Sequence, residues 1–289
     1  MIACPQCGTR YPSAATVCPA CAFEPSSLRG ILAWAPEMAG AGGGFKAEYF
    51  STLVEMEEGN FWFRARNAII GWALRKYFGE PESLLEVGCG TGFVLAGIAK
   101  VSATTQLTGS EIFIDGLSFA VDRVRTARFV QMDARRMPYV EEFDVVASFD
   151  VLEHIEQDEL VLRNFWQALK PGGGVLLTVP QHQWLWSEAD AYACHVRRYS
   201  AEELHAKLDR AGFDIVRTTS FTSLLLPAMM LSRRRARSDR PFDPRAEFNI
   251  PSVLNSALEG ILAVERQLVR LGIDFPAGGS RLVVARKRN

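Results

Sequence analysis

The order of apolar and polar positions divides most of the chain into short strands that alternate with helices. Short apolar runs bounded by turn residues predict buried strands, and apolar residues spaced three and four apart predict helices. The segment from 45 to 78 is expected to be helical. Strands are expected at Ser83–Val87, Gln106–Glu111, Arg128–Met132, Phe143–Phe149, Val175–Pro180, Phe213–Ser220 and Arg281–Lys287, with helices at Phe93–Lys100, Asp115–Arg125, Leu160–Leu169 and Ala201–Ala211.

This alternation predicts an α/β fold with a mostly parallel sheet that is covered by helices on both faces. A helical insert is expected at about 221–275, before the last strand. One apolar face of the insert recurs at helical spacing and is expected to cover the core. Its residues are Val253, Leu254, Ala257, Leu258, Ile261, Leu262 and Leu268.

Composition narrows the class of protein. The chain has 289 residues, 48% of them hydrophobic, which suffices for one substantial core and an appendage. The net charge of −1 shows no basic excess of the kind that favours nucleic-acid binding. The N-terminus lacks the apolar stretch of a signal peptide, and no run of ~18 apolar residues predicts a membrane span. We therefore expect a cytoplasmic protein.

Four of the six cysteines lie near the N-terminus, in two C-x-x-C pairs. Two such turns can present four thiolates in the tetrahedral arrangement that Zn²⁺ prefers, and the metal would supply the folding energy of so short a segment. A disulfide pair or redox-active thiols is the alternative, which a reducing cytosol disfavours. The predicted ligands are Cys4, Cys7, Cys18 and Cys21.

The cysteine pattern and the glycine content predict the domain boundaries. Residues 1–25 are expected to form the zinc ribbon. Residues 26–44, which contain the run Gly42–Gly44, are expected to be a flexible linker. The main domain is expected to span 45–289.

Glycines spaced two apart follow the first strand of the main domain, in "LLEVGCGTGFVLAG". Ligands of parallel α/β sheets bind outside the carboxyl ends of the strands. Glycines let backbone N–H groups approach a ligand closely, and the following helix N-terminus favours an anionic group. The sequence therefore predicts a ligand site at this loop.

The stretch "LLEVGCGTG" resembles motif I of class I S-adenosylmethionine-dependent methyltransferases, and the resemblance extends over about 45–287. It implies a Rossmann-like sheet of seven strands in the order 3-2-1-4-5-7-6, with the last strand antiparallel. It also implies that S-adenosylmethionine is bound, with Glu86 near its amino group, Glu111 at the ribose and Asp133 at the adenine. The expected cofactor-binding residues are Glu86, Gly88, Cys89, Gly90, Gly92, Glu111, Asp133, Ala134 and Asp150.

Each of these acids also has a purely structural interpretation. Glu111 can be a solvated loop residue, and Asp133 can stabilise a turn at the end of its strand. Asp150 and Glu153 can cap the helix that follows them. These alternatives remain open at the level of the sequence.

The loop after the fifth strand, "PQHQWLWSEADAYACHVRRYS", lies on the ligand side of the predicted sheet. Histidine is the usual base near neutral pH, so His182 or His195 is a candidate general base. His154, just after the fourth strand, is a further catalytic candidate. Arg197 and Arg198 can bind an anionic acceptor. Structural roles for all of them are the alternative.

The residues after the fourth strand, "FDVLEH", resemble the small-molecule branch of the family, which includes O- and C-methylating enzymes of quinone biosynthesis. We therefore expect a small-molecule acceptor, such as a lipid-linked or glycan precursor. The alternatives are a ribosomal RNA methyltransferase that uses the ribbon to recognise RNA, and a non-catalytic binding protein whose ribbon docks a protein partner. Nucleic acid is disfavoured because Arg10 is the ribbon's only cation.

An apolar patch followed by arginines lies within 221–240. This combination is typical of peripheral contact with an anionic membrane surface. The alternative is a lid helix with a solvated basic tail. The arginines are Arg233, Arg234, Arg235 and Arg237.

The cysteine pattern generates a direct test. We expect elemental analysis to find one tightly bound zinc ion per chain, because four thiolates complete its coordination. A Cys4→Ser/Cys7→Ser variant should lose that zinc. Equal zinc content in the variant and the natural chain would contradict the assignment.

Overall fold

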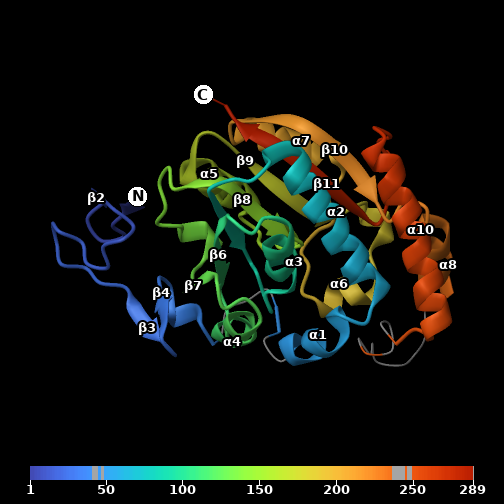
Figure 1. Cartoon of the computed structure of the whole chain (residues 1–289), viewed down its shortest axis with the longest axis horizontal. Helices are drawn as coiled ribbons and strands as arrows, with labels where there is room; N and C mark the ends of the chain where they lie inside the picture. Colours follow the sequence, from blue (N-terminus) through green and yellow to red (C-terminus); the bar gives the residue numbers. More distant parts are fainter. Residues whose placement is uncertain (41–44, 47–48, 236–244, 246–248, 289) are drawn as a thin grey trace.

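The computed structural model describes residues 1–40, 45–46, 49–235, 245 and 249–288, and Figure 1 shows the whole chain. Two short strands, β1 (Ile2–Ala3) and β2 (Arg10–Tyr11), form a small antiparallel sheet at the N-terminal end. All other strands belong to one sheet. They are β3 (Ser26–Leu28), β4 (Ile31–Ala33), β5 (Ser83–Val87), β6 (Gln106–Glu111), β7 (Arg128–Gln131), β8 (Phe143–Phe149), β9 (Leu169–Pro180), β10 (Phe213–Phe221) and β11 (Ser280–Lys287).

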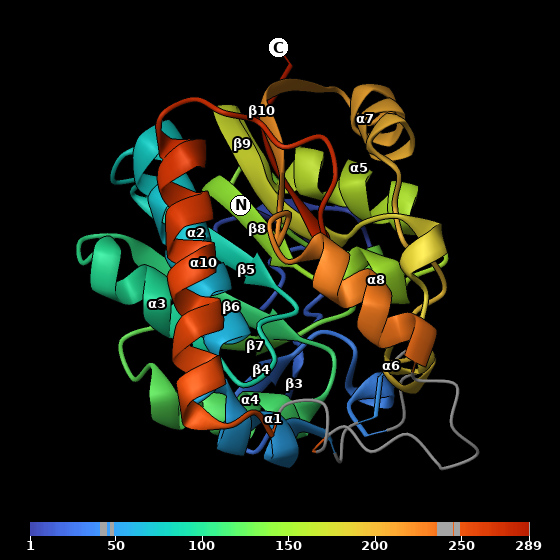
Figure 2. The same ribbon diagram turned by 90° about the vertical axis from the view of Figure 1, so that its right-hand side faces the viewer.

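The order of the large sheet is β10-β11-β9-β8-β5-β6-β7-β4-β3, which Figure 2 shows from the side. β5 through β9 run parallel to one another, and β11 is antiparallel to both of its neighbours. Numbered from β5, seven of these strands have the order 3-2-1-4-5-7-6. The predicted class I methyltransferase topology is therefore confirmed, with two strands added at one edge.

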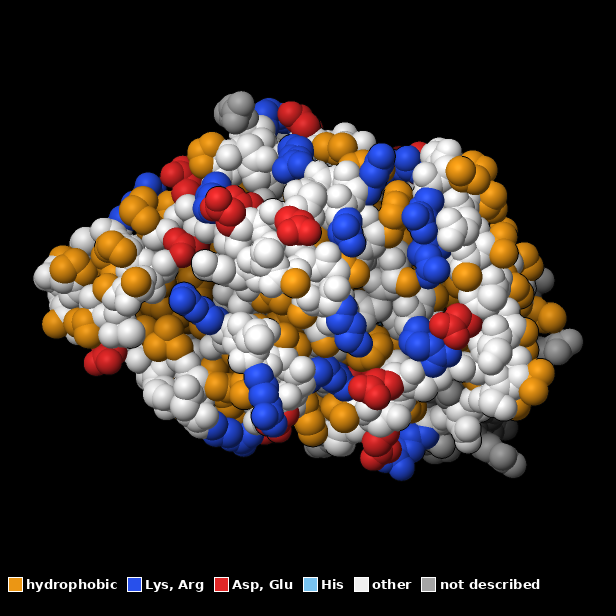
Figure 3. Space-filling model, viewed as in Figure 1, with side chains coloured by type: hydrophobic (Ala, Val, Ile, Leu, Met, Phe, Trp, Pro, Cys, Tyr) orange, Lys and Arg blue, Asp and Glu red, His pale blue; other side chains and the backbone are white. Residues whose placement is uncertain are grey.

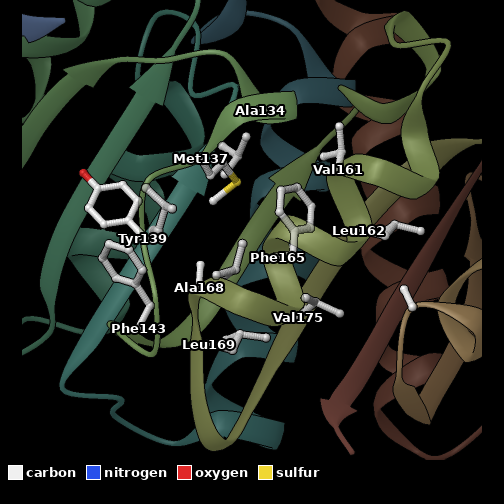
Figure 4. Packing of buried hydrophobic residues seen from close by; sticks show 14 of the residues in the cluster. Ala134, Met137, Tyr139, Phe143, Val161, Leu162, Phe165, Ala168, Leu169 and Val175 are labelled. Carbon is white, nitrogen blue, oxygen red and sulfur yellow. The ribbon is translucent and has the colours of Figure 1, made fainter. Parts of the chain in front are cut away.

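Helices cover both faces of the sheet because the strands alternate their side chains between two apolar cores. Leu84 packs with helix residues of one core, and the next residue, Leu85, packs into the other. Figure 4 shows part of the second core around Phe165. The described helices are α1 (Tyr49–Glu57), α2 (Phe61–Phe78), α3 (Phe93–Val101), α4 (Ile114–Arg123), α5 (Asp158–Ala168), α6 (Glu188–Tyr192), α7 (Ala201–Arg210), α8 (Leu226–Arg235) and α10 (Ser252–Arg270).

The segment predicted to be a flexible linker is structured over much of its length, so that part of the prediction is wrong. β3 and β4 form a hairpin, and β4 pairs in parallel with β7 at the edge of the sheet. The backbone N–H of Trp34 donates to the carbonyl of Gln131, which extends this pairing. Gly-rich composition further along concealed the pairing, and residues 42–44 lie outside the described residues.

The N-terminal cysteines converge as predicted. The Sγ atoms of Cys4 and Cys21 lie 3.5 Å apart, and those of Cys7 and Cys18 lie 3.6 Å apart. Thiolates at about 2.3 Å from one Zn²⁺ would be separated by a similar distance, so the four sulfurs fit a zinc ion. All six cysteines, which belong to the described part of the chain, are free thiols rather than disulfides.

The cysteine ribbon is joined to the main domain by packing as well as by the chain. Ile2 forms a bridge with Tyr139, and the N–H of Ala3 donates to the carbonyl of Pro138. Tyr11 and Cys18 are buried in the same apolar cluster as Phe165. The ribbon therefore packs against the main domain and shares its apolar core.

The apolar face of α10 was predicted to cover the core, and the structure corrects this. Val253 is 82% exposed and Leu254 50% exposed, and Ile261 and Val264 are also exposed. Only its Leu262 side packs inward, together with Glu265 and Val269. Figure 3 shows hydrophobic side chains along the edge of the molecule where α10 and α8 lie. No described helix has the length and apolar character needed to cross a membrane.

Candidate active site

A cavity of about 1030 Å³ opens at the carboxyl ends of the parallel strands. Its floor comes from the residues that directly follow β5, β6, β7 and β8, and α1, α2, α6 and α8 contribute to its walls. This is the edge at which a doubly wound sheet binds its ligands. Its volume is at the upper end of the range for small-molecule sites.

The loop after β5 lines the cavity with a left-handed backbone. Gly88 and Gly90 have φ values of +74° and +51°, a conformation that residues with a Cβ rarely adopt. A Cβ atom on Gly88 would lie 2.4 Å from a methyl carbon of Val151. The N–H groups of Gly88 and Cys89 both donate to the carbonyl of Ser110, which fixes the loop against β6.

Gly92 was predicted to contact the cofactor, but it is not among the described residues that line the cavity. It caps the N-terminus of α3, with φ of +76°. A Cβ atom there would lie 3.0 Å from the Cα atom of Ala120. Close packing between α3 and α4 therefore explains this glycine.

Glu111, at the end of β6, holds the glycine loop. Its carboxylate accepts hydrogen bonds from the N–H groups of Gly90, Ile112 and Phe113 at 3.1, 2.8 and 3.2 Å. Burial raises the pKa of Glu111, and these three N–H donors oppose that effect. The side chain lies in the cavity wall, so a solvated loop acid is excluded.

Asp133 follows β7 and also lines the cavity. Its carboxylate accepts hydrogen bonds from the N–H and the Nε of Arg135, at 2.9 and 3.0 Å. Burial acts to raise the pKa of Asp133, but the hydrogen bonds from Arg135 outweigh it and hold this pKa below its ordinary value. Asp133 thus stabilises the turn that follows β7, and it also lies in the cavity wall next to Ala134.

Glu86 of β5 is a buried acid of the cavity floor. It is 2% exposed, and no donor from the described residues lies within hydrogen-bond distance of its Oε2 atom. Burial is the main cause that raises its pKa to about 8, while the charge of Arg66 acts in the opposite direction. A buried carboxylate without a donor is suited to receive a cationic group from a ligand.

α1 and α2 close one side of the cavity. Trp62 and Arg66 of α2 line it, whereas Arg64 is paired with Glu259 of α10. α1 contributes aromatic residues that the sequence analysis missed. They are Tyr49 and Phe50, and Phe45 precedes them on the same wall.

A buried network anchors α1 to the glycine loop. The hydroxyl of Thr91 donates to Glu57 at 2.6 Å, and Arg123 of α4 donates to both residues at 2.8 Å. Glu57 is 5% exposed, so its charge is compensated inside the protein.

Asp150, directly after β8, has a positive φ of +57° and forms an ion pair with Arg66. Non-glycine residues in this region of φ and ψ are strained, and such strain concentrates at functional sites. The pair connects the end of β8 to α2 across the cavity floor. The interpretation of Asp150 as a helix cap is not supported, since η3 (Leu152–His154) is capped by Val151 without a side-chain bond.

His195 also lines the cavity, and α6 positions it. Its Nδ1 is 3.0 Å from Oδ1 of Asp190, which is buried and is paired with Arg198 at 2.5 Å. Burial acts to raise the pKa of Asp190, but the hydrogen bond with His195 and the charge of Arg198 hold it well below its ordinary value. An ionised Asp190 accepts from Nδ1–H and leaves Nε2 as the basic nitrogen.

Glu153 and His154 meet His195 from the other side. The rings of His154 and His195 are 4.7 Å apart, and the buried carboxylate of Glu153 lies 3.9 Å from His195 Nε2. Burial raises the pKa of Glu153 well above its ordinary value. One ligand atom from each of the three residues falls within 4.8 Å of the others, so this group has the composition of a cation site.

His182 and Arg197 are separated from this arrangement. His182 is not among the described residues that line the cavity, and its ring stacks on Trp184 at 4.9 Å. Arg197 is paired with Asp158 at 2.6 Å and donates to the carbonyls of Ile155 and Glu156. Arg198 does line the cavity, but its donors are used by Asp190 and by the carbonyls of Gln181 and Gly279.

The part of the cavity near His195 contains further residues from α6 and from the insert. Tyr192 of α6 packs its ring edge-on against Tyr49 at 5.5 Å. Leu225, Met229 and Arg233 enter from the insert, and Arg233 lies 3.9 Å from Asp190. Periodicity predicted a helix here but could not indicate that it faces the cavity. Arg237, predicted to belong to the same basic patch, lies outside the described residues.

Comparisons with known proteins agree with this geometry. A family model described as a methyltransferase domain matches residues 60–218. A protein of Mycolicibacterium smegmatis named as an S-adenosylmethionine-dependent methyltransferase is 26% identical over 75% of this chain and 88% of its own length. The ubiquinone biosynthesis O-methyltransferase of Hydrogenovibrio crunogenus is 27% identical over 34% of this chain and 43% of its own length.

Solved structures show the same fold. A chain in the complex between the Haloferax volcanii Trm112 methyltransferase activator and a methyltransferase aligns with a TM-score of 0.55 and 16% identity, covering 84% of this chain and 94% of that chain. The family match spans more than half of the sequence and includes the glycine loop and the acids after β6, β7 and β8. The chain therefore belongs to the methyltransferase-domain family and is a class I S-adenosylmethionine-dependent methyltransferase.

Proposed function

We propose that this enzyme transfers the methyl group of S-adenosylmethionine to an oxygen or carbon atom of a small molecule that has an apolar part. The observation that carries this proposal is the acceptor end of the cavity. There, Tyr192, Leu225 and Met229 line the cavity together with His154 and His195, and helix α8 of the insert borders the space. The relative named as a ubiquinone biosynthesis O-methyltransferase supports an acceptor of this class.

The chain's own residues divide the cavity into a cofactor end and an acceptor end. We assign Glu86 to the ammonium group of the cofactor, because it is a buried carboxylate whose Oε2 has no donor among the described residues. Glu111 has carboxylate lone pairs beyond those used by the backbone and is assigned to the ribose hydroxyls. Gly88, Cys89, Gly90, Ala134 and Asp150 line the remaining wall, and Asp133 is assigned to the adenine.

The reaction needs little beyond positioning. When bound, S-adenosylmethionine supplies an electrophilic methyl group on a sulfonium. The walls hold the acceptor in line with that methyl group and exclude water, which converts a bimolecular step into an effectively unimolecular one. For a hydroxyl acceptor, His195 is assigned as the base that receives the proton at Nε2, while Asp190 fixes the ring. His154 packs against that ring and keeps it in place.

A Gly90→Arg substitution tests the placement of the cofactor. Gly90 lines the cavity at φ +51°, so an arginine side chain there would fill the space beside the glycine loop. We expect calorimetry to find saturable S-adenosylmethionine binding that this variant loses. Gly79→Arg is the matched control, since Gly79 also has a positive φ but has open space around it and lies outside the cavity. Full binding by Gly90→Arg would defeat the assignment.

The raised pKa of Glu86 predicts that protons are released when the cofactor binds. With its pKa raised to about 8, Glu86 is mostly protonated at pH 7 in the free enzyme. A cofactor ammonium favours the ionised carboxylate, so binding at pH 7 should release close to one proton. Calorimetry in two buffers of different ionisation enthalpy measures this number. Glu86→Gln should abolish that release, and an unchanged value would show that another group is responsible.

The acceptor class is tested by salt dependence. A small apolar acceptor predicts that a fluorescent structured RNA shows no saturable binding at either 50 or 200 mM salt, because few phosphate contacts would form. RNA recognition would instead give binding that weakens by about 10³-fold or more over such a range. In parallel, S-adenosylhomocysteine release should rise with a panel of hydroxylated aromatic and lipid-like molecules. Tight, salt-sensitive RNA binding would overturn the proposal in favour of an RNA methyltransferase.

A further inference from the structure

The turn that follows the hairpin of β3 and β4 reaches the cavity. This turn, residues 34–39, includes the short helix η1 (Pro36–Met38), and Met38 lines the cavity together with Glu111 and Asp133. No sequence motif marked this residue, because it lies in the segment predicted to be a linker. Met38 therefore lies in the wall near the two acids that the proposed function assigns to the ribose and the adenine.

Gln131 holds the turn in place through a fully buried side chain. Its Oε1 accepts from the N–H of Ala35 at 3.1 Å, and its Nε2 donates to the carbonyl of Ala35 at 2.8 Å. The same Nε2 donates at 2.8 Å to the carbonyl of Ile112, which also lines the cavity. One amide therefore joins the turn to the residue after Glu111, and both contacts are shielded from water.

The far end of the turn is fixed to α4 and to the residues after β7. The carbonyl of Ala39 accepts from the N–H of Ile114, the first residue of α4. The Sδ atom of Met38 lies 3.6 Å from Arg135, the residue that binds Asp133. The turn thus contacts the segments that carry both acids of this end of the cavity.

The other end of the turn leads to the cysteines. Phe23 stacks on Trp34 with ring centroids 6.4 Å apart, and its carbonyl accepts the N–H of Cys18 at 2.9 Å. Cys21, Phe23 and Trp34 pack against the same apolar cluster. A continuous set of contacts therefore runs from the second C-x-x-C turn, through the two rings, to the backbone that Gln131 holds.

We propose that the metal-bound cysteine ribbon supports the turn that forms one wall of the cofactor site, and that Met38 in this turn is a positioning residue for the adenosine part of S-adenosylmethionine. The inference rests on the proposed placement of the cofactor and on the fit of the four sulfurs to zinc. A ribbon that loses its metal would no longer fix Phe23 and Trp34, so the turn that carries Met38 would lose its support. Cofactor affinity is then linked to occupancy of a metal site outside the cavity.

Calorimetric titration with S-adenosylhomocysteine tests both parts, because it measures affinity without the unidentified acceptor. We expect Met38→Ala to weaken binding about tenfold and Met38→Leu to restore most of it, since Leu replaces the apolar volume. Glu37→Ala is the matched control, because Glu37 belongs to the same turn, is exposed and does not line the cavity. It should bind as the natural chain does.

The Cys4→Ser/Cys7→Ser variant tests the connection to the metal. It should bind S-adenosylhomocysteine at least fivefold more weakly, while circular dichroism shows an unchanged content of helix and strand. Chelation of zinc from the natural chain should give the same loss if the variant does not fold. Full affinity in the zinc-free protein, or in Met38→Ala, overturns the inference. If Gly90→Arg also binds normally, the cofactor placement itself is wrong.

Discussion

The hydrogen bond between the Glu111 carboxylate and the N–H of Gly90 is the contact on which the arrangement of the cavity depends. It ties the loop after β5 to the end of β6, and the same carboxylate orders the two residues that follow. The loop can be held this closely only because Gly88 and Gly90 adopt a left-handed backbone. The main-chain groups of this loop thereby form one wall of the cavity. Two further acids of the cavity floor, Asp133 and Asp150, follow the neighbouring strands β7 and β8.

The topology could be predicted because local patterns agree with the global fold. The apolar run Phe143–Phe149 is a buried strand between helices on both faces, and its predicted boundaries match the structure. The next strand was predicted to begin at Val175, but β9 already begins at Leu169. The cluster of four cysteines and the glycine loop could also be predicted, because in both cases the chemistry requires particular residue types at short spacing. Of the predicted cofactor residues, only Gly92 has a packing role in place of a position on the wall.

Other features depend on contacts between distant segments, which a single sequence does not reveal. Nothing in the linker composition indicates that Gln131, nearly a hundred residues away, binds Ala35 with its side chain. Spacing could not separate His195 from His182, since both lie in one loop; the difference is that Asp190 faces only the former. The apolar stripe of α10 satisfied the helical period and still lies largely on the surface, because periodicity fixes a face and not its direction.

The hairpin of β3 and β4 also has a consequence for the solubility of the chain. Without it, β7 would be the terminal strand of a long sheet and would present unpaired N–H and carbonyl groups to other molecules. β3 is short and carries two serines, Ser26 and Ser27, so the edge that remains is poorly suited to pair with a further strand. The N-terminal segment therefore protects this edge of the sheet against association between copies.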